Sequence, residues 1–340
     1  MRLMCALFVI VSHSFALLNR ILDEPLCHLG GMMNAADIGL CGFFTISGYL
    51  ILNSLVTSKN ILSYLGKRCL RIFPGLLVCL IMVATVCSFF YIGEGSYWTQ
   101  KETYSFVWNN LGLYTIQGDI PGVFTDNPYT TGVNGSLWTL AYEFTLYILI
   151  IGLFFVRKHR PVIAGLTAVA LVLCLTKNIF FVEKFAHTQY HSIWVNLFVP
   201  FAQYFATGML LQNRTYFRSN KTRWIIVGIC AAVAICLVVT NMYIQPRVPL
   251  KPLVMLFISV VFVLVGEMYW QPVSDGLKRI GDMSYGTYIY AFPIQQMLIA
   301  MIPSVNPWLL TLLTIVVVLP IAYGSWRLIE KPALGLKRFL

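Results

Sequence analysis

The chain has 340 residues, of which 58% are hydrophobic and only 11% are charged, with a formal net charge of +11. Soluble domains carry roughly 25% charged residues, so this chain lacks the polar groups needed to cover a globular surface. The composition therefore indicates a polytopic membrane protein. It excludes a soluble enzyme, a disordered chain and a nucleic-acid binder.

Ten apolar stretches approach the ~20 residues that a membrane-spanning helix needs. In chain order they are 3–18, 38–56, 72–92, 137–156, 161–176, 193–211, 224–242, 250–267, 283–302 and 307–328. Backbone groups in hydrocarbon must satisfy their own hydrogen bonds, which favours helices. We therefore predict an all-α polytopic membrane protein of about ten transmembrane helices, with residues 1–340 forming a single membrane domain and no separate soluble domain.

The distribution of Lys and Arg residues orients these predicted spans. With the N-terminus in the cytoplasm, eighteen of the 24 Lys and Arg residues fall inside and six fall outside. Cytoplasmic loops carry the excess of basic residues in membrane proteins. Both termini are therefore predicted to be cytoplasmic, and the long loop 93–136 to be extracytoplasmic.

His13 lies in the first predicted span and Arg2 directly precedes this span. The two residues are eleven positions apart and so share one helix face at ~16 Å separation. In this orientation Arg2 lies at the cytoplasmic surface and His13 in the outer half of the bilayer. Within the ten spans, only His13 and Glu143 are titratable groups far from the span ends. Ionisable residues inside a membrane are functional candidates by default.

The run KRCLRIFP, which contains Lys67, Arg68 and Arg71, lies at the cytoplasmic mouth of the third predicted span. Arg68 and Arg71 are spaced to share a helix face, and arginine presents planar donor forks suited to phosphate. The alternative is that these cations only mark the cytoplasmic side and attract anionic lipid head groups. Pro74 is expected to break or bend the helix entry.

The fourth predicted span brings Glu143 to ~10 Å below the outer surface, a depth similar to that of His13. A histidine with a carboxylate partner is the usual arrangement of a general base, although a structural hydrogen bond between two helices is the alternative. His187 and His191 have a spacing that suits a metal, but no third ligand stands nearby. No metal site is predicted.

Six motifs in order make the chain resemble the membrane acyltransferase-3 family, which includes bacterial O-antigen and surface-glycan O-acetyltransferases. They are Arg2 with His13 in an R-x10-H pattern, FFTISGYLI (43–51), KRCLRIFP (67–74), NGSLWTLAYEF (134–144), MSYGTYIYAFPIQ (283–295) and SWRLIEKPAL (325–334). The resemblance covers nearly the whole chain. The sequence departs from the family at Cys41, where many members carry Asp, and at Ala291, where many carry His.

The resemblance implies an O-acyltransferase that takes an acetyl group from cytoplasmic acetyl-CoA, a co-substrate rather than a permanently bound cofactor. The acceptor would be a sugar hydroxyl of a lipid-linked or nascent surface polysaccharide, with lipopolysaccharide O-antigen favoured. The enzyme would lie among the lipids of the bacterial inner membrane, with its acceptor side in the periplasm. It would bind no nucleic acid.

The resemblance also assigns roles to residues of this chain. His13 would be the general base, and Glu143 would hold its imidazole or share its proton. The residues expected to bind CoA are Arg2, Lys67, Arg68 and Arg71, and those expected on the acceptor side are Ser136 and Trp138.

Several alternatives stay open from the sequence. A covalent acyl-enzyme and direct transfer look the same in a sequence. The transferred group could be succinyl or another acyl group, and the acceptor a different glycan. The rival from another class is a proton-coupled transporter of glycan intermediates or small acids, with His13 and Glu143 as its proton relay.

Overall fold

The computed structural model describes residues 1–130, 132–181, 188–212, 219–246, 248–268 and 281–340, and these are helical apart from loops and one short hairpin. The helices are α1 (Arg2–Ala16), α2 (Ala35–Thr57), α3 (Ile61–Cys87), α4 (Lys101–Leu111), α5 (Trp138–Leu149), α6 (Arg160–Phe180), α7 (Val195–Gln212), α8 (Asn220–Ile244), α9 (Lys251–Glu267), α11 (Ser284–Met301), α12 (Pro307–Ser325) and α13 (Lys331–Gly335). Strands β1 (Gln189–Tyr190) and β2 (Ile193–Trp194) pair antiparallel. The prediction of an all-α chain is confirmed for these residues.

Each of the ten predicted spans overlaps one of these helices. Within the described residues, six helical segments are long and apolar enough to cross a membrane: Ala35–Thr57, Ile61–Phe90, Trp138–Val156, Arg160–Phe180, Asn220–Ile244 and Pro307–Phe339. Helix α1 is apolar but has only 15 residues. The structure therefore supports a membrane protein with several spanning helices.

Asparagine side chains cap the N-termini of three of the long helices. Asn34 accepts a hydrogen bond from the backbone N–H of Asp37, and the Asp37 carboxylate accepts one from the backbone N–H of Asn34, which forms a capping box before α2. Asn60 and Asn306 cap α3 and α12 in the same way with one bond each. These caps satisfy backbone donors that a helix start leaves free.

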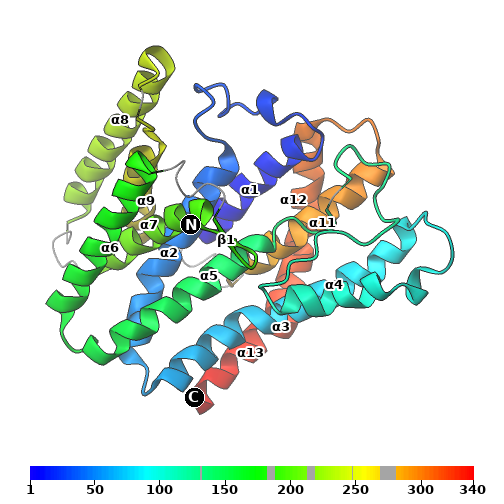
Figure 1. The fold of residues 1–340 in the computed structure, drawn as a ribbon, viewed down its shortest axis with the longest axis horizontal. Coiled ribbons are helices and arrows are strands. Elements are labelled where there is room, and N and C mark those ends of the chain that lie inside the picture. The colour runs from blue at the N-terminus through cyan, green and yellow to red at the C-terminus, as the bar shows by residue number, and fades with distance from the viewer. Residues whose placement is uncertain (131, 182–187, 213–218, 247, 269–280) are drawn as a thin grey trace.

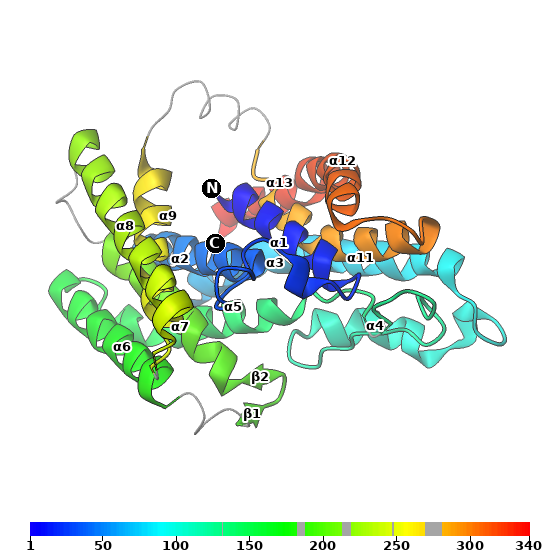
Figure 2. The same ribbon diagram turned by 90° about the horizontal axis from the view of Figure 1, so that it is seen from above.

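The helices form a bundle in which α1, α2, α3 and α5 lie between two outer groups (Figures 1 and 2). Helices α6, α7, α8 and α9 gather at one end, and α4, α11 and α12 at the other. At the α2–α7 crossing, a Cβ built on Gly48 would lie 2.0 Å from the Phe205 carbonyl oxygen. A Cβ on Gly208 would lie equally close to the Thr45 carbonyl oxygen. Two glycines thus permit backbone contact between α2 and α7.

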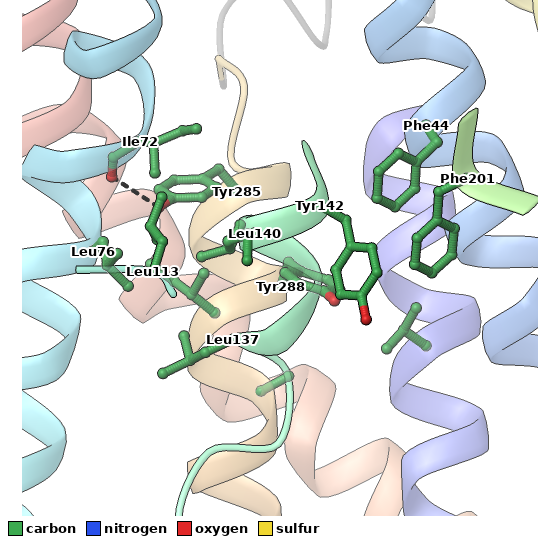
Figure 3. Close-up of a cluster of buried hydrophobic side chains, with 14 of the residues drawn as sticks. Phe44, Ile72, Leu76, Leu113, Leu137, Leu140, Tyr142, Phe201, Tyr285 and Tyr288 are labelled. Atoms are coloured by element: carbon green, nitrogen blue, oxygen red, sulfur yellow. Dashed lines mark hydrogen bonds between the residues drawn. The ribbon is translucent and has the colours of Figure 1, made fainter. Parts of the chain in front are cut away.

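A buried aromatic and aliphatic cluster fills the space between α2, α3, α5, α7 and α11 (Figure 3). The rings of Phe44 and Phe201 stack with centroids 4.2 Å apart, which ties α2 to α7. The Tyr285 hydroxyl donates a hydrogen bond to the Ile72 carbonyl oxygen at 2.8 Å, which ties α11 to α3. This cluster holds the helices that carry the predicted site residues.

Two elements differ from the sequence-based expectation. Helix α3 begins at Ile61 and continues through Pro74, so the basic run lies within the helix rather than before a break. The loop 93–136 contains α4, which packs against α3 (Figure 1). The apolar pattern missed α4 because this helix carries polar residues along its length.

Candidate active site

A cavity of about 330 Å³ lies where α1, α2, α3, α5 and α11 meet the C-terminal segment. Its apolar walls include side chains of α2, α3 and α5. Its charged lining consists of the cations Arg2, Arg68, Arg71 and Lys337 and the carboxylates Glu143 and Asp282. A mainly apolar cavity with a few convergent charges has the character of a ligand site.

Arg71 is held in this cavity by two carboxylates from distant parts of the chain. Its guanidinium lies 2.6 Å from Asp282 and 4.0 Å from Glu330, and the Glu330 side chain is only 2% exposed. Arg2 lies 3.9 Å from the same Asp282 oxygen. The charge of Arg71 is therefore largely compensated within the protein, and Asp282 links α1 to α3.

The surroundings of Asp282 keep it ionised. Burial, the largest single influence, raises the pKa of this carboxyl, but the charges of Arg71 and Arg2 and the hydrogen bonds from Ser284 and Arg71 together outweigh burial and hold the pKa at about 2. The Ser284 hydroxyl also donates a hydrogen bond to the carboxylate at 2.5 Å. A depressed pKa means that the charge is present above pH ~4 and is lost only as the pH falls towards about 2.

Arg68 has different surroundings although it lies on the same helix. Its guanidinium donates to the Ser54 hydroxyl at 3.2 Å and lies 5.8 Å from the centre of the Tyr147 ring. Among the described residues, its buried Nε has no hydrogen-bond partner. Lys67, by contrast, donates to the Ser58 hydroxyl at 3.1 Å and does not line the cavity. Of the four residues expected to bind CoA, Arg2, Arg68 and Arg71 therefore line one cavity, and Lys67 does not.

Glu143 belongs to the same cationic cavity. Its carboxylate accepts hydrogen bonds from the Ser47 hydroxyl at 2.6 Å and from the Tyr147 hydroxyl. Arg2 donates to the Ser47 oxygen at 3.2 Å, so Ser47 joins the carboxylate to the start of α1. Glu143 thus orders the wall of this cavity.

His13 lines a second cavity of about 370 Å³ together with Phe292 of α11 and Trp138 of α5. The extracytoplasmic loop predicted at 93–136 contributes residues between 116 and 135 to the same lining. The Phe292 ring packs edge-on against the imidazole, with centroids 5.2 Å apart at 82°. Nδ1 of His13 is buried and has no hydrogen-bond partner among the described residues.

Neighbours on both sides of His13 fix α1 at this level. Ser12 donates to Glu24 at 2.8 Å, and the Glu24 side chain is 1% exposed in the loop before α2. Ser14 accepts hydrogen bonds from Gln295 and Thr311, each at 2.8 Å. Sequence reasoning missed these residues. Gln295 ends a recognised motif, whereas Glu24 lies outside the predicted spans and gave no signal.

The sequence had led us to expect that His13 and Glu143 meet, but the structure does not bring them together. They line different cavities, and the hydrogen-bond partners of Glu143 are Ser47 and Tyr147. The depth estimate failed because Trp138, at the start of α5, already lies at the level of His13. Glu143 follows five residues later, ~7.5 Å further along the helix.

The two residues expected on the acceptor side have different positions relative to the cavity of His13. Trp138 lines the cavity of His13. Ser136 is 1% exposed and lines none of the cavities described here. Its neighbours Asn134 and Gly135 line the His13 cavity instead. His187, which the sequence had paired with His191, lies outside the described residues.

The linings of the two cavities adjoin along α5 and α11. Thr139 and Tyr288 line the cationic cavity, and their hydroxyls are hydrogen-bonded at 2.6 Å. Trp138, one residue before Thr139, lines the cavity of His13. Phe292, one helical turn after Tyr288, lines it as well.

A family described as an acyltransferase domain matches residues 1–327. The chain belongs to the acyltransferase-3 family. An O-acetyl transferase of Shigella phage Sf6 is 28% identical over 97% of this chain and 93% of its own length. Nodulation protein 10 of Rhizobium leguminosarum bv. viciae is 26% identical over 100% of this chain and 93% of its own length. No solved structure matches.

This acyltransferase-3 protein is therefore an O-acyltransferase, and the family resemblance read from the motifs is confirmed. The family favours a transferase over the transporter that the sequence had left open. Together with the apolar helices, it indicates an enzyme embedded in a membrane.

Proposed function

We propose that this enzyme transfers an acetyl group from cytoplasmic acetyl-CoA to a sugar hydroxyl of a lipid-linked surface glycan, with lipopolysaccharide O-antigen as the preferred acceptor. It would do so in a bacterial inner membrane, with about ten spanning helices, both termini in the cytoplasm and the acceptor in the periplasm. The O-acetyl transferase of phage Sf6 supports acetyl as the transferred group.

The observation that carries this proposal is the position of α1 between two cavities. Arg2 lines the cationic cavity, and His13, ~16 Å further along the same helix, lines the cavity beneath the extracytoplasmic loop. A phosphate-bearing donor suits the first cavity, because arginine binds phosphate with paired donors. A titratable base suits the second.

In this mechanism the CoA phosphates bind Arg68, with Arg2 and Lys337 adding positive charge. The pantetheine arm extends past Thr139 and Tyr288 and presents the thioester to His13. Asp282 and Glu330 hold Arg71 in place, and the Glu143–Ser47 bond keeps the cavity wall ordered.

His13 acts as the general base for direct transfer. It takes the proton from the sugar hydroxyl while the hydroxyl oxygen attacks the carbonyl carbon of the thioester. The C–S bond then breaks, the ester forms, and the imidazolium returns the proton to the sulfur of CoA. Atoms and charge balance without another reactant.

The test is to express the enzyme in a bacterium that makes O-antigen and to examine the purified polysaccharide by proton NMR. Wild-type enzyme should add O-acetyl signals, and His13→Ala should abolish them while the protein stays in the membrane. His28→Ala, which removes an exposed histidine from the loop after α1, is the matched control and should retain the signals. Near-normal acetylation by His13→Ala would overturn the role of His13.

A further inference from the structure

A third cavity, of about 450 Å³, opens beside the cavity of His13 and has no part in the mechanism above. The first residues of α5, α7 and α9 and the last residues of α6 line it, together with the start of α2. Trp138 lines both this cavity and that of His13, so the two meet at one side chain. A ligand larger than one sugar at His13 would extend into this space.

The polar lining of this cavity is built from amides. Asn178 donates to the side-chain oxygen of Gln203 at 2.9 Å, and Gln203 donates to the Pro252 carbonyl oxygen at 2.8 Å. Gln203 is fully buried. The side-chain oxygen of Asn196 is also buried and has no hydrogen-bond partner among the described residues. A buried acceptor without a partner is costly, and a ligand hydroxyl would satisfy it.

Charged and aromatic groups complete the lining. Asp37 and Lys251 form an ion pair of 2.8 Å at the helix starts of α2 and α9. The rings of Trp138 and Phe201 lie 5.7 Å apart. Aromatic faces suit the C–H faces of a sugar, while amides and a carboxylate suit its hydroxyl groups.

We propose that this cavity binds a second sugar residue of the acceptor glycan, next to the sugar whose hydroxyl meets His13. The inference rests on the proposed function and makes it more specific, because the enzyme would read at least two neighbouring sugars. Trp138 would contact the linkage between them, and Asn196 would accept a hydrogen bond from the second sugar.

The experiment uses two probes prepared from the polysaccharide that the enzyme acetylates, after alkaline removal of the acetyl groups. One is the monosaccharide glycoside that bears the target hydroxyl, and the other is the fragment one sugar longer. Acetyl transfer to each is measured with purified full-length enzyme. For wild-type enzyme, KM should be about tenfold or more lower for the longer fragment, as expected for hydrogen bonds to buried groups.

Asn196→Trp fills the cavity and should bring the ratio of the two KM values close to one. Asn196→Ala, a milder change that keeps the proposal testable if the tryptophan variant fails to fold, should reduce the ratio about threefold or more. Val248→Trp is the matched control, since Val248 is 39% exposed and does not line the cavity. It should leave the ratio as in wild type.

The outcomes separate this inference from the proposed function. If no polysaccharide is acetylated, the proposed function fails, and the second sugar site, which rests on it, fails with it. If both fragments are acetylated with equal KM, or if Asn196→Ala keeps the wild-type ratio, the proposed function stands and the second sugar site is wrong.

Discussion

Arg68 and Arg71 lie one helical turn apart, and the structure gives them opposite electrostatic surroundings. Asp282 and Glu330 compensate Arg71, whereas no described carboxylate forms an ion pair with Arg68. A phosphate competes poorly for a guanidinium that already binds two carboxylates. We therefore propose that Arg68 binds phosphate and that Arg71 has a positioning role.

This difference predicts different consequences of the same substitution. Arg68→Gln should weaken CoA binding about tenfold or more, because a charge-assisted hydrogen bond to phosphate is lost, and should leave thermal stability nearly unchanged. Arg71→Gln should destabilise the protein by ~3 kcal/mol, because it leaves the buried Glu330 without its cation. Titration calorimetry and thermal unfolding in detergent measure the two effects.

A double variant provides the control for Arg71. Arg71→Gln combined with Glu330→Gln removes both charges and should recover part of the stability that Arg71→Gln loses. Unchanged CoA affinity in Arg68→Gln, or normal stability in Arg71→Gln, would contradict the roles assigned here.

The crossing of α2 and α7 is the element-scale feature on which the site depends. Helix α2 carries Ser47, the partner of Glu143, and α7 carries Gln203 of the third cavity. Gly48 and Gly208 allow the two backbones to touch. The cavities on both sides of α2 therefore depend on this close packing.

Gly208→Ala should lower the thermal unfolding midpoint by several degrees. The added Cβ would lie 2.0 Å from the Thr45 carbonyl oxygen, and overpacking of this kind costs ~1–3 kcal/mol. Gly228→Ala on α8 is the matched control, because a Cβ there meets nothing within 4 Å. It should be neutral or slightly stabilising, since alanine favours helix over glycine. Equal effects of the two substitutions would argue against backbone contact.

At the scale of the whole molecule, the transfer direction depends on topology. Lys59 and Lys101 lie on either side of α3 and are both exposed. In the proposed orientation Lys59 faces the cytoplasm and Lys101 the periplasm, because most Lys and Arg residues gather on the side of Lys59.

Single cysteines in a cysteine-free background test this orientation. A membrane-impermeant thiol reagent applied to intact spheroplasts should label Lys101→Cys at once. It should label Lys59→Cys only after the membrane is permeabilised. The reverse pattern of labelling would overturn the orientation and place the cationic cavity outside the cell.

Much of the fold followed from local properties of the sequence. Each of the ten apolar runs overlaps a helix, because a helix satisfies its own backbone hydrogen bonds, and six described helical segments are long and apolar enough to cross a membrane. The motifs located the family, and the placement of Arg2 and His13 along α1 needed only the rise per residue. Helix α4 and the early start of α3 escaped notice, because both are polar segments.

What the sequence by itself determined was therefore the class of protein, its helices, its family and the separation of Arg2 from His13 along one helix. The tertiary structure decided which side chains meet. It joined Glu143 to Ser47 rather than to His13, compensated Arg71 with Asp282 and Glu330, and set Asn196 in a cavity beside Trp138. Among these contacts, that of Arg71 with Glu330 joins residues some 260 positions apart. These contacts depend on how helices pack and rotate, which local composition does not specify.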